Sequence, residues 1–367
     1  MSEDSILEQI IENKQSQALT DLNLKVILNN LLNNLSEREN QVISLRYGLK
    51  SPEKKTLEEI GKQFQVTRER IRQIENAALK KVKNHSQFNS IIEPIKQVVQ
   101  QTLDEYGKAM HHDLLLDKIL IIPGNTAVNR FAASFIINQL LTSELSYHPE
   151  TEETYPIWKL PAISLDDILG ILKLLILLIE KYNQPLNLEE VYFNFKKEEP
   201  EMAGQIDEKI IHSYFVISKK IEKNPFGEWG LKNWQSITPK RMTDKVFLVL
   251  KKSGQPLHFT AIAEKINEIG FDNKKANPAT IHNELILDDK YVLVGRGIYA
   301  LKEWGYEPGV VIDVIQSIIK NEGSLTKDEI IEKVLEKRQV KKSTIALSLM
   351  NKKYFTRGHD KKYTLNG

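Results

Sequence analysis

Six Arg or Lys side chains and only two acidic ones lie in the seventeen residues from Thr67 to Lys83. At about 100° per residue, Glu69, Gln73, Asn76 and Lys80 fall within roughly 60° of one another on one side of a helix. Phosphates require only cations, whereas base edges in the major groove require matched donors and acceptors. This mixed face predicts sequence-reading contacts with duplex DNA. The alternative is a solvated helix face that is stabilised by ion pairs.

Two short helices joined by a tight turn are predicted to position that face. Thr56 and Glu59 have the spacing of a capping box, which starts a helix that should end near Phe64. Thr67 can cap a second helix. Its apolar residues recur at three- to four-residue spacing, namely Ile71, Ile74, Ala78 and Val82. A helix-turn-helix whose second helix carries a mixed polar face is typical of DNA-binding proteins.

The stretch LSERENQVISLRYGL (Leu35–Leu49), followed by TLEEIGKQFQVTRERIRQIENAALKKV (Thr56–Val82), resembles region 4 of the primary bacterial sigma factors. The resemblance implies that the module reads the minus-35 promoter element and packs against the flap of the RNA polymerase beta subunit. Base reading is implied for Arg68, Glu69 and Gln73. Contacts with the DNA backbone are implied for five further residues, Thr56, Thr67, Arg70, Arg72 and Lys80.

The resemblance implies that the helices from about Leu22 to Tyr47 face polymerase. We expect an apolar surface there, of which part closes the module's own core and part receives the flap. Its residues are Leu24, Ile27, Leu28, Leu31 and Leu32. About twenty residues precede the match, too few for the helical region 2 with which complete sigma factors capture the unpaired downstream hexamer. We therefore expect that this chain does not melt promoters alone.

The residues after the helix-turn-helix repeat a triplet of an aromatic residue, a variable residue and Leu. The triplet starts at Trp158, Trp229, Tyr299 and Tyr363, in steps of 71, 70 and 64 residues, which predicts four units of similar size. Each unit has helical apolar spacing first and then a short β-type end typical of a hairpin. The predicted fold class is mainly α, a helix-turn-helix module followed by tandem winged-helix units with small β hairpins.

Two of these units resemble known families. Pro185–Phe195 with Glu228–Trp234 is similar to the winged-helix domain of the RNA polymerase delta subunit, and Asp244–Asn267 with GRGIYALKEWGY is similar to the wider HARE-HTH group. The acidic tail of the delta subunit has no counterpart, so displacement of nucleic acid from polymerase is not implied. The predicted domains are a helical lead (1–21), the sigma-like module (22–86) and four winged-helix units (87–162, 163–238, 239–306 and 307–367).

The fourth unit differs from the others in its charge. Between Lys337 and Gly367 there are nine Lys or Arg residues and one acid, Asp360. A second contact with DNA or RNA is predicted there, and a solvated basic end is the alternative. The cations of this candidate patch are Lys341, Lys342, Lys352, Lys353, Arg357, Lys361 and Lys362.

Composition favours binding over catalysis. The 367 residues include no Cys, carry a net charge of +2 and do not start like a signal peptide, as expected of a cytoplasmic protein. The most apolar stretch, Ile168–Ile179, is interrupted by Lys173 and is too short to span a bilayer. The His residues are scattered, and the sequence has neither a phosphate-binding Gly-rich loop nor a nucleophile motif. We therefore expect no metal site, cofactor, small-molecule substrate, membrane contact or enzymatic activity.

These features predict a transcription protein that acts through promoter DNA and RNA polymerase. The leading hypothesis is an auxiliary initiation factor that supplies or competes for contacts with the upstream hexamer. One alternative is a polymerase-associated scaffold in which the sigma-like module merely docks on the beta flap. Another is one half of a split sigma factor.

Overall fold

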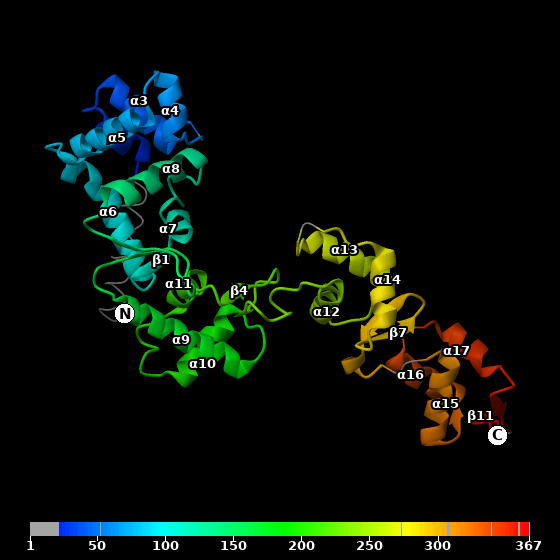
Figure 1. Ribbon diagram of the computed structural model, residues 1–367. Coiled ribbons are helices and arrows are strands. Elements are labelled where there is room, and N and C mark those ends of the chain that lie inside the picture. Colours follow the sequence, from blue (N-terminus) through cyan, green and yellow to red (C-terminus); the bar gives the residue numbers. More distant parts are fainter. Residues whose placement is uncertain are drawn as a thin grey trace. The chain divides into compact units, whose positions relative to one another are not determined.

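The computed structural model describes residues 22–51, 53–272, 274–306, 309–338, 340–358 and 360–366. The predicted helical lead, residues 1–21, lies outside this part of the chain. The chain forms two compact units, and each consists of two segments of the sequence. One runs to Glu222 and includes Trp229–Lys232, and the other includes Lys223–Glu228 and resumes at Asn233. Both consist mainly of helices with small sheets (Figure 1).

The predicted helix-turn-helix is present and is preceded by two helices. These elements are α2 (Leu24–Leu32), α3 (Glu37–Tyr47), α4 (Leu57–Phe64) and α5 (Arg68–Lys83). The hydroxyl of Thr56 accepts the Glu59 N–H in a capping box, and Thr67 accepts the N–H of Arg70. The predicted end of α4 at Phe64 and the predicted caps of both helices are confirmed.

The turn between α4 and α5 depends on a close backbone approach at Gly61. Gln65 has a left-handed φ of 55°, and the N–H of Val66 donates to the carbonyl of Gly61 over 2.9 Å. A Cβ atom at position 61 would lie 2.7 Å from the carbonyl oxygen of Val66. Glycine is therefore the residue that lets the chain turn tightly enough to hold α5 against α4.

Four successive stretches then repeat one order: a helix, a short strand or bridge, two helices and two strands. The first has α6 (Phe88–Glu105), β1 (Ala109–His111), α7 (His112–Ile119), α8 (Ala127–Phe135), the π-helical turn η1 (Ile136–Leu140), β2 (Ser146–His148) and β3 (Ile157–Lys159). The second has α9 (Leu165–Tyr182), α10 (Leu188–Glu198), α11 (Glu208–Ile217), β4 (Ile221–Lys223) and β5 (Trp229–Leu231).

The third stretch has α12 (Met242–Ser253), β6 (Leu257–His258), α13 (Phe259–Ile269), α14 (Pro278–Leu287), β7 (Tyr291–Gly295), β8 (Ile298–Leu301) and the 3-10 turn η2 (Lys302–Trp304). The fourth has α15 (Val311–Glu322), β9 (Leu325–Thr326), α16 (Lys327–Lys337), α17 (Lys342–Leu349), β10 (Phe355–Arg357) and β11 (Lys362–Leu365).

The last strand of each stretch lies in the middle of its small sheet. The strand orders are β1-β3-β2, β6-β8-β7 and β10-β11-β9, and in the second stretch β5 pairs with β4 and bridges to Leu186. This last strand carries the repeated aromatic residue, which is at most 9% exposed at all four positions, Trp158, Trp229, Tyr299 and Tyr363. The predicted fold class, mainly α with a helix-turn-helix followed by winged-helix units, is confirmed.

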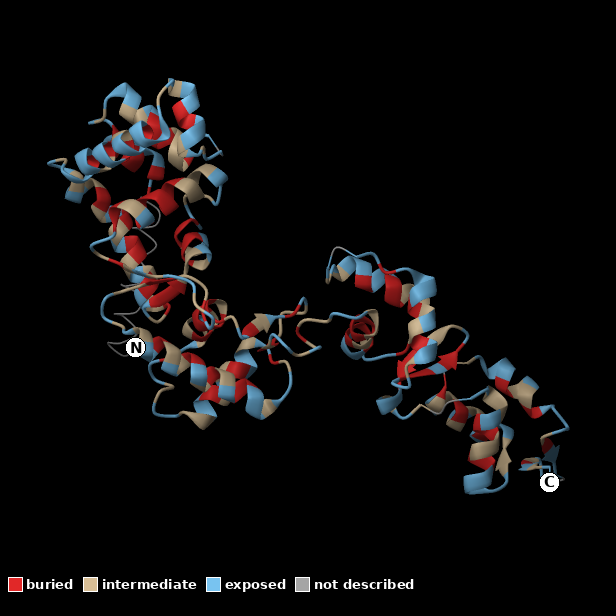
Figure 2. Cartoon of the chain, viewed as in Figure 1, coloured by how far each residue is buried: buried red, intermediate tan, exposed pale blue. Residues whose placement is uncertain are grey.

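One hydrophobic core joins the helix-turn-helix to the first winged-helix stretch. The five apolar residues of α2 are each at most 7% exposed, namely Leu24, Ile27, Leu28, Leu31 and Leu32. They share this core with side chains of α6, α7 and α8, and Figure 2 shows buried residues on the inward sides of these helices. The expectation that part of this surface is free to receive a flap is wrong, because α6 and α8 pack on α2.

Two aromatic side chains of α8 hold the end of α3. Gly48 caps α3 with a φ of 70°, and a Cβ atom there would lie 2.6 Å from the ring of Phe131. Phe135 is buried, and its ring centroid lies 4.7 Å from that of Tyr47. Because α3 packs against α5, these contacts set how α5 is oriented on the first winged-helix stretch.

The most apolar stretch of the sequence forms α9, which packs within its unit. Its inward residues are Ile168, Leu172, Leu175, Leu178 and Ile179, whereas Lys173 is exposed. No helix in the described part of the chain has the length and apolar character of a membrane span.

Arg338 links the third and fourth stretches within the second unit. Its guanidinium is buried and donates to the carbonyl of Leu293 over 2.7 Å and to the carbonyl of Gly309. Burial lowers the pKa of this guanidinium from its usual value. One of the nine cations of the basic C-terminal region therefore faces inward.

Candidate nucleic-acid interface

The structure exposes all eight residues that the sequence assigns to DNA contacts. Seven lie on α5 or at its cap, and Thr56 lies at the start of α4. The opposite side of α5 is fully buried at Ile71, Ala78 and Val82. The predicted division of α5 into an apolar inward stripe and a polar outward face is thus present.

Neighbouring side chains hold the candidate base-reading groups one helical turn apart. Arg72 donates two hydrogen bonds to the Glu69 carboxylate, at 2.8 and 2.7 Å, and Arg70 donates to the amide oxygen of Gln73 at 3.1 Å. The hydrogen bonds from Arg72 lower the pKa of Glu69, so its carboxylate stays ionised as an acceptor. These exposed pairs can be exchanged for contacts with bases and phosphates at little cost.

Thr56 and Thr67 act as helix caps. Their hydroxyls therefore lie beside the first N–H groups of α4 and α5, which have no carbonyl partner within the helix. Thr56 donates to the Glu59 carboxylate at 2.8 Å, and the Thr67 hydroxyl lies 3.2 Å from the N–H of Arg70. The N-terminal end of a helix carries a partial positive charge that favours a phosphate. The geometry at both caps is therefore compatible with contacts to the DNA backbone.

Glu75 supports the interface and was not identified from the sequence. Its carboxylate is buried, accepts the hydroxyl of Tyr47 at 2.7 Å and lies 3.5 Å from Nε of Arg46. Burial, together with this hydrogen bond, raises the pKa of Tyr47 above its usual value. Glu75 falls four residues after Ile71, so helical spacing alone could have placed it on the inward stripe.

The three cations in the last turn of α5 have different surroundings. Lys81 pairs with Glu39 of α3 at 2.6 Å, and Lys83 donates to the hydroxyl of Thr142 at 3.4 Å. Lys80 is exposed on the outward face. Among the three, Lys80 is therefore the best placed for a phosphate.

Replacing Lys80 with Ala should weaken binding to all duplexes and reduce the slope of log affinity against log salt by about one, because one phosphate contact is lost. The measurement is fluorescence anisotropy at several salt concentrations. Lys81→Ala is the matched control, since it removes the same charge from the same turn on the side that faces α3. Equal changes in slope for both variants would contradict a phosphate contact at Lys80.

Residues 31–84 match the family model described as Sigma-70, region 4. This segment of the chain is similar to sigma-70 region 4. RNA polymerase sigma factor SigA of Microcystis aeruginosa and SigA of Synechocystis sp. are each 56% identical to this chain over 69 residues, which are 19% of this chain and 16% of each relative. SigA of Clostridium acetobutylicum is 46% identical over 93 residues, 24% of this chain and 25% of that protein.

The chain spans a quarter or less of the length of these relatives. The predicted resemblance to region 4 is confirmed over residues 31–84, which include α3, α4 and α5. The resemblances of the later units to the delta subunit and to the HARE-HTH group stay predictions.

The cations of the second candidate patch lie on neighbouring elements of the fourth winged-helix stretch. Lys341 and Lys342 are at the start of α17, and Lys352 and Lys353 follow its end. Arg357 lies on β10, and Lys361 and Lys362 lie at the start of β11. All are exposed except the half-buried Lys362. Nucleic-acid binding by this surface remains a prediction.

The adjacent residues His111 and His112 have partners inside the first winged-helix stretch. The indole N–H of Trp158 donates to Nδ1 of His112 at 3.0 Å, and Nε2 of His112 lies 3.2 Å from the hydroxyl of Ser134. His111 accepts the N–H of Asp113 at 3.3 Å. Within the described part of the chain, no group of three or more His, Asp or Glu residues is arranged to hold a metal ion.

Acid should destabilise this stretch through His112. Burial lowers the pKa of His112 below its ordinary 6.5, so the unfolded chain binds the proton more readily than the folded one. The stabilisation is complete above pH 6.5 and is lost as the pH falls toward the lower pKa of the folded state. Thermal unfolding between about pH 7 and pH 5 should therefore shift more in wild type than in His112→Gln. Equal shifts in wild type and His112→Gln would contradict the expectation.

Proposed function

We propose that this protein is a transcription-initiation factor whose sigma-like module reads a minus-35-type element in duplex promoter DNA. The observation that carries the proposal is the outward face of α5, where Arg68, Glu69 and Gln73 are exposed on the second helix of a helix-turn-helix. This face lies in the segment that is similar to sigma-70 region 4. It combines guanidinium, carboxylate and amide groups, the set that major-groove readout needs.

RNA polymerase is the proposed protein partner, in the cytoplasm, because the matched relatives are RNA polymerase sigma factors. The beta flap is the proposed docking point on the enzyme. The apolar side of α2 is filled by α6 and α8 of the same chain. A flap segment must therefore displace these helices or bind another face of α2–α5.

The proposed domain limits are those of the sequence prediction: 22–86 for the sigma-like module and 87–162, 163–238, 239–306 and 307–367 for the winged-helix units. The repeated order of elements supports the four later limits. The core shared by α2, α6 and α8 makes the first two domains one packed body.

Core polymerase mixed with this protein alone should give no permanganate-reactive thymines at a promoter. Opening requires unpaired bases to be captured on accessible aromatic platforms. Between Leu22 and Lys83 the aromatic residues are Tyr47, which contacts Glu75, and Phe64, which is half-buried. The aromatic residues of the four triplets are buried in their cores, and the exposed aromatic side chains of the described residues, Tyr147 and Phe193, lie on separate elements, β2 and α10.

Addition of a cognate sigma factor should restore opening, with this protein changing its extent or the choice of promoter. The control is the sigma factor with core polymerase alone. Strong opening by core polymerase and this chain without a sigma factor would refute the auxiliary role. If this protein changes neither the extent of opening nor the choice of promoter when the sigma factor is present, the proposal of an initiation factor itself fails.

A polymerase-associated scaffold is the second candidate, and the third helix of the third winged-helix stretch favours it. In DNA-binding helix-turn-helix proteins a helix at this place enters the groove. Here α14 exposes Ile286 and Leu287, the latter at 82%. The exposed residues of α14 carry no charge, and its one acidic side chain, Glu284, is half-buried. Such a surface suits a protein partner better than a phosphate backbone.

A further inference from the structure

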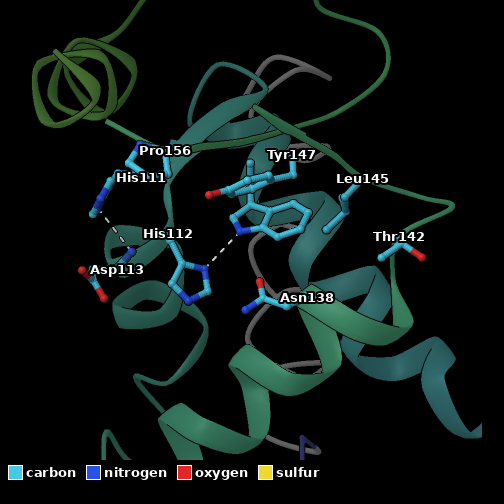
Figure 3. Close-up of a pocket in the computed structure, with 9 residues that line it drawn as sticks. His111, His112, Asp113, Asn138, Thr142, Leu145, Tyr147 and Pro156 are labelled. Carbon is cyan, nitrogen blue, oxygen red and sulfur yellow. Dashed lines mark hydrogen bonds between the residues drawn. The ribbon is translucent and has the colours of Figure 1, made fainter. Parts of the chain in front are cut away.

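A cavity of about 550 Å³ opens in the first winged-helix stretch, between α7, η1 and the strands β2 and β3 (Figure 3). Its volume is within the range of sites that hold small molecules. Its walls are partly aromatic. Tyr147 is 54% exposed, and its ring centroid lies 5.0 Å from that of the buried Trp158. Leu145 and Pro156 add apolar surface beside the two rings, so a flat ring can be held by stacking.

A hydrogen-bond chain fixes the polar side of this cavity. The indole N–H of Trp158 can only donate, so Nδ1 of His112 is the acceptor and carries no proton. Burial lowers the pKa of His112, so the ring is neutral near pH 7 and Nε2 donates to the hydroxyl of Ser134. The amide nitrogen of Asn138 donates to the same hydroxyl at 3.1 Å.

These hydrogen bonds orient the amide of Asn138 at the cavity. With one N–H directed to Ser134, the second N–H and the oxygen of Asn138 remain as a donor and an acceptor. Figure 3 shows Asn138 among the residues that line the cavity. An Asn amide presented in this way matches the N6 and N7 edge of adenine, to which it can donate and accept one hydrogen bond each.

The charge of the lining is compatible with an uncharged ligand. Among the described residues that line the cavity there is no Lys or Arg, and one carboxylate, Asp113, which accepts a hydrogen bond from Arg130 at 2.8 Å. We propose that this cavity binds an adenine ring, stacked on Tyr147 and paired through its N6 and N7 edge with Asn138. The inference goes beyond the proposed reading of duplex DNA by α5 and does not depend on it.

Calorimetric titration of the full chain with adenosine tests the proposal, and inosine is the matched ligand. Inosine replaces the N6 donor with an acceptor, so its affinity should be roughly tenfold lower through the loss of one matched hydrogen bond.

Tyr147→Ala and Asn138→Ala should each lower the affinity for adenosine about tenfold or more. Both side chains are exposed, so the unfolding temperatures of the variants should stay close to wild type. Phe193→Ala, an exposed aromatic residue of α10 outside the cavity, should leave adenosine binding unchanged.

A short single-stranded oligodeoxyadenylate distinguishes free adenosine from an unpaired base of a strand. Tighter binding of the oligonucleotide than of adenosine, with the same losses in Tyr147→Ala and Asn138→Ala, assigns the ring to a strand. Equal or weaker binding assigns it to the free nucleoside. The proposal is overturned if wild type binds neither ligand, if adenosine and inosine bind equally, or if Tyr147→Ala leaves binding intact.

Discussion

Phe135→Ala is expected to lower the free energy of unfolding of the first unit by about 3 to 5 kcal/mol. The Phe135 side chain is 2% exposed, lies in the core shared by α2, α6 and α8, and packs its ring 4.7 Å from that of Tyr47. Its removal leaves a cavity at the contact between α3 and α8, where the backbone has little room to collapse. Chemical denaturation followed by circular dichroism measures the loss.

The matched control is Phe193→Ala, because Phe193 is 70% exposed on α10 of the same unit. That substitution should change the unfolding free energy by no more than about 0.5 kcal/mol. A loss of less than about 1 kcal/mol for Phe135→Ala would mean that α8 does not fasten the helix-turn-helix as the structure shows.

Arg68→Ala or Gln73→Ala should each reduce the preference for the favoured hexamer over a scrambled duplex by roughly 5- to 100-fold, while binding to the scrambled duplex stays nearly intact. Both side chains are exposed on the outward face of α5. Neither lies on the buried stripe that Ile71 and Ala78 define, so the helix should remain folded. Anisotropy titrations of matched labelled duplexes, with each variant checked for its unfolding temperature, measure the preference.

Lys25→Ala is the control for this comparison, because Lys25 is exposed on α2, outside the helix-turn-helix. It should preserve the hexamer preference. If Arg68→Ala weakens specific and scrambled duplexes equally, Arg68 contacts only the backbone and base readout by this residue is refuted.

Local sequence signals predicted the elements of the helix-turn-helix well. The capping box at Thr56 and Glu59 and the cap at Thr67 are contacts between residues three apart. They depend only on the local sequence and can therefore be predicted from it. The repeated aromatic residue was equally informative. It marks the central strand of each small sheet, where a large side chain must be buried.

Long-range packing could not be predicted in the same way. The apolar residues of α2 have helical spacing whether they face a partner or their own chain, and only the folded positions of α6 and α8 decide between the two. The same holds for the partner of Glu75. Helical spacing places Glu75 on the inward stripe, but the Tyr47 hydroxyl that stabilises it there is 28 residues away in the sequence.

The helical period alone placed Glu69, Gln73 and Lys80 on one face that points away from the core. The other candidate DNA-contacting residues were assigned through the resemblance to region 4. The cavity beside Trp158 had no such signal. It is built from residues of α7, η1, β2 and β3, and its polar side depends on hydrogen bonds that join His112, Ser134 and Asn138.

The packing of α6 and α8 on α2 also determines how the proposed DNA specificity could be moved between proteins. A segment exchange that cuts after α5 would transplant one half of a hydrophobic core and leave Phe131 and Phe135 facing an unrelated helix. The outward residues of α5 make no contribution to that core. New promoter preferences should therefore be grafted as individual surface substitutions on α5, with the scaffold of α2, α3, α6 and α8 kept as it is.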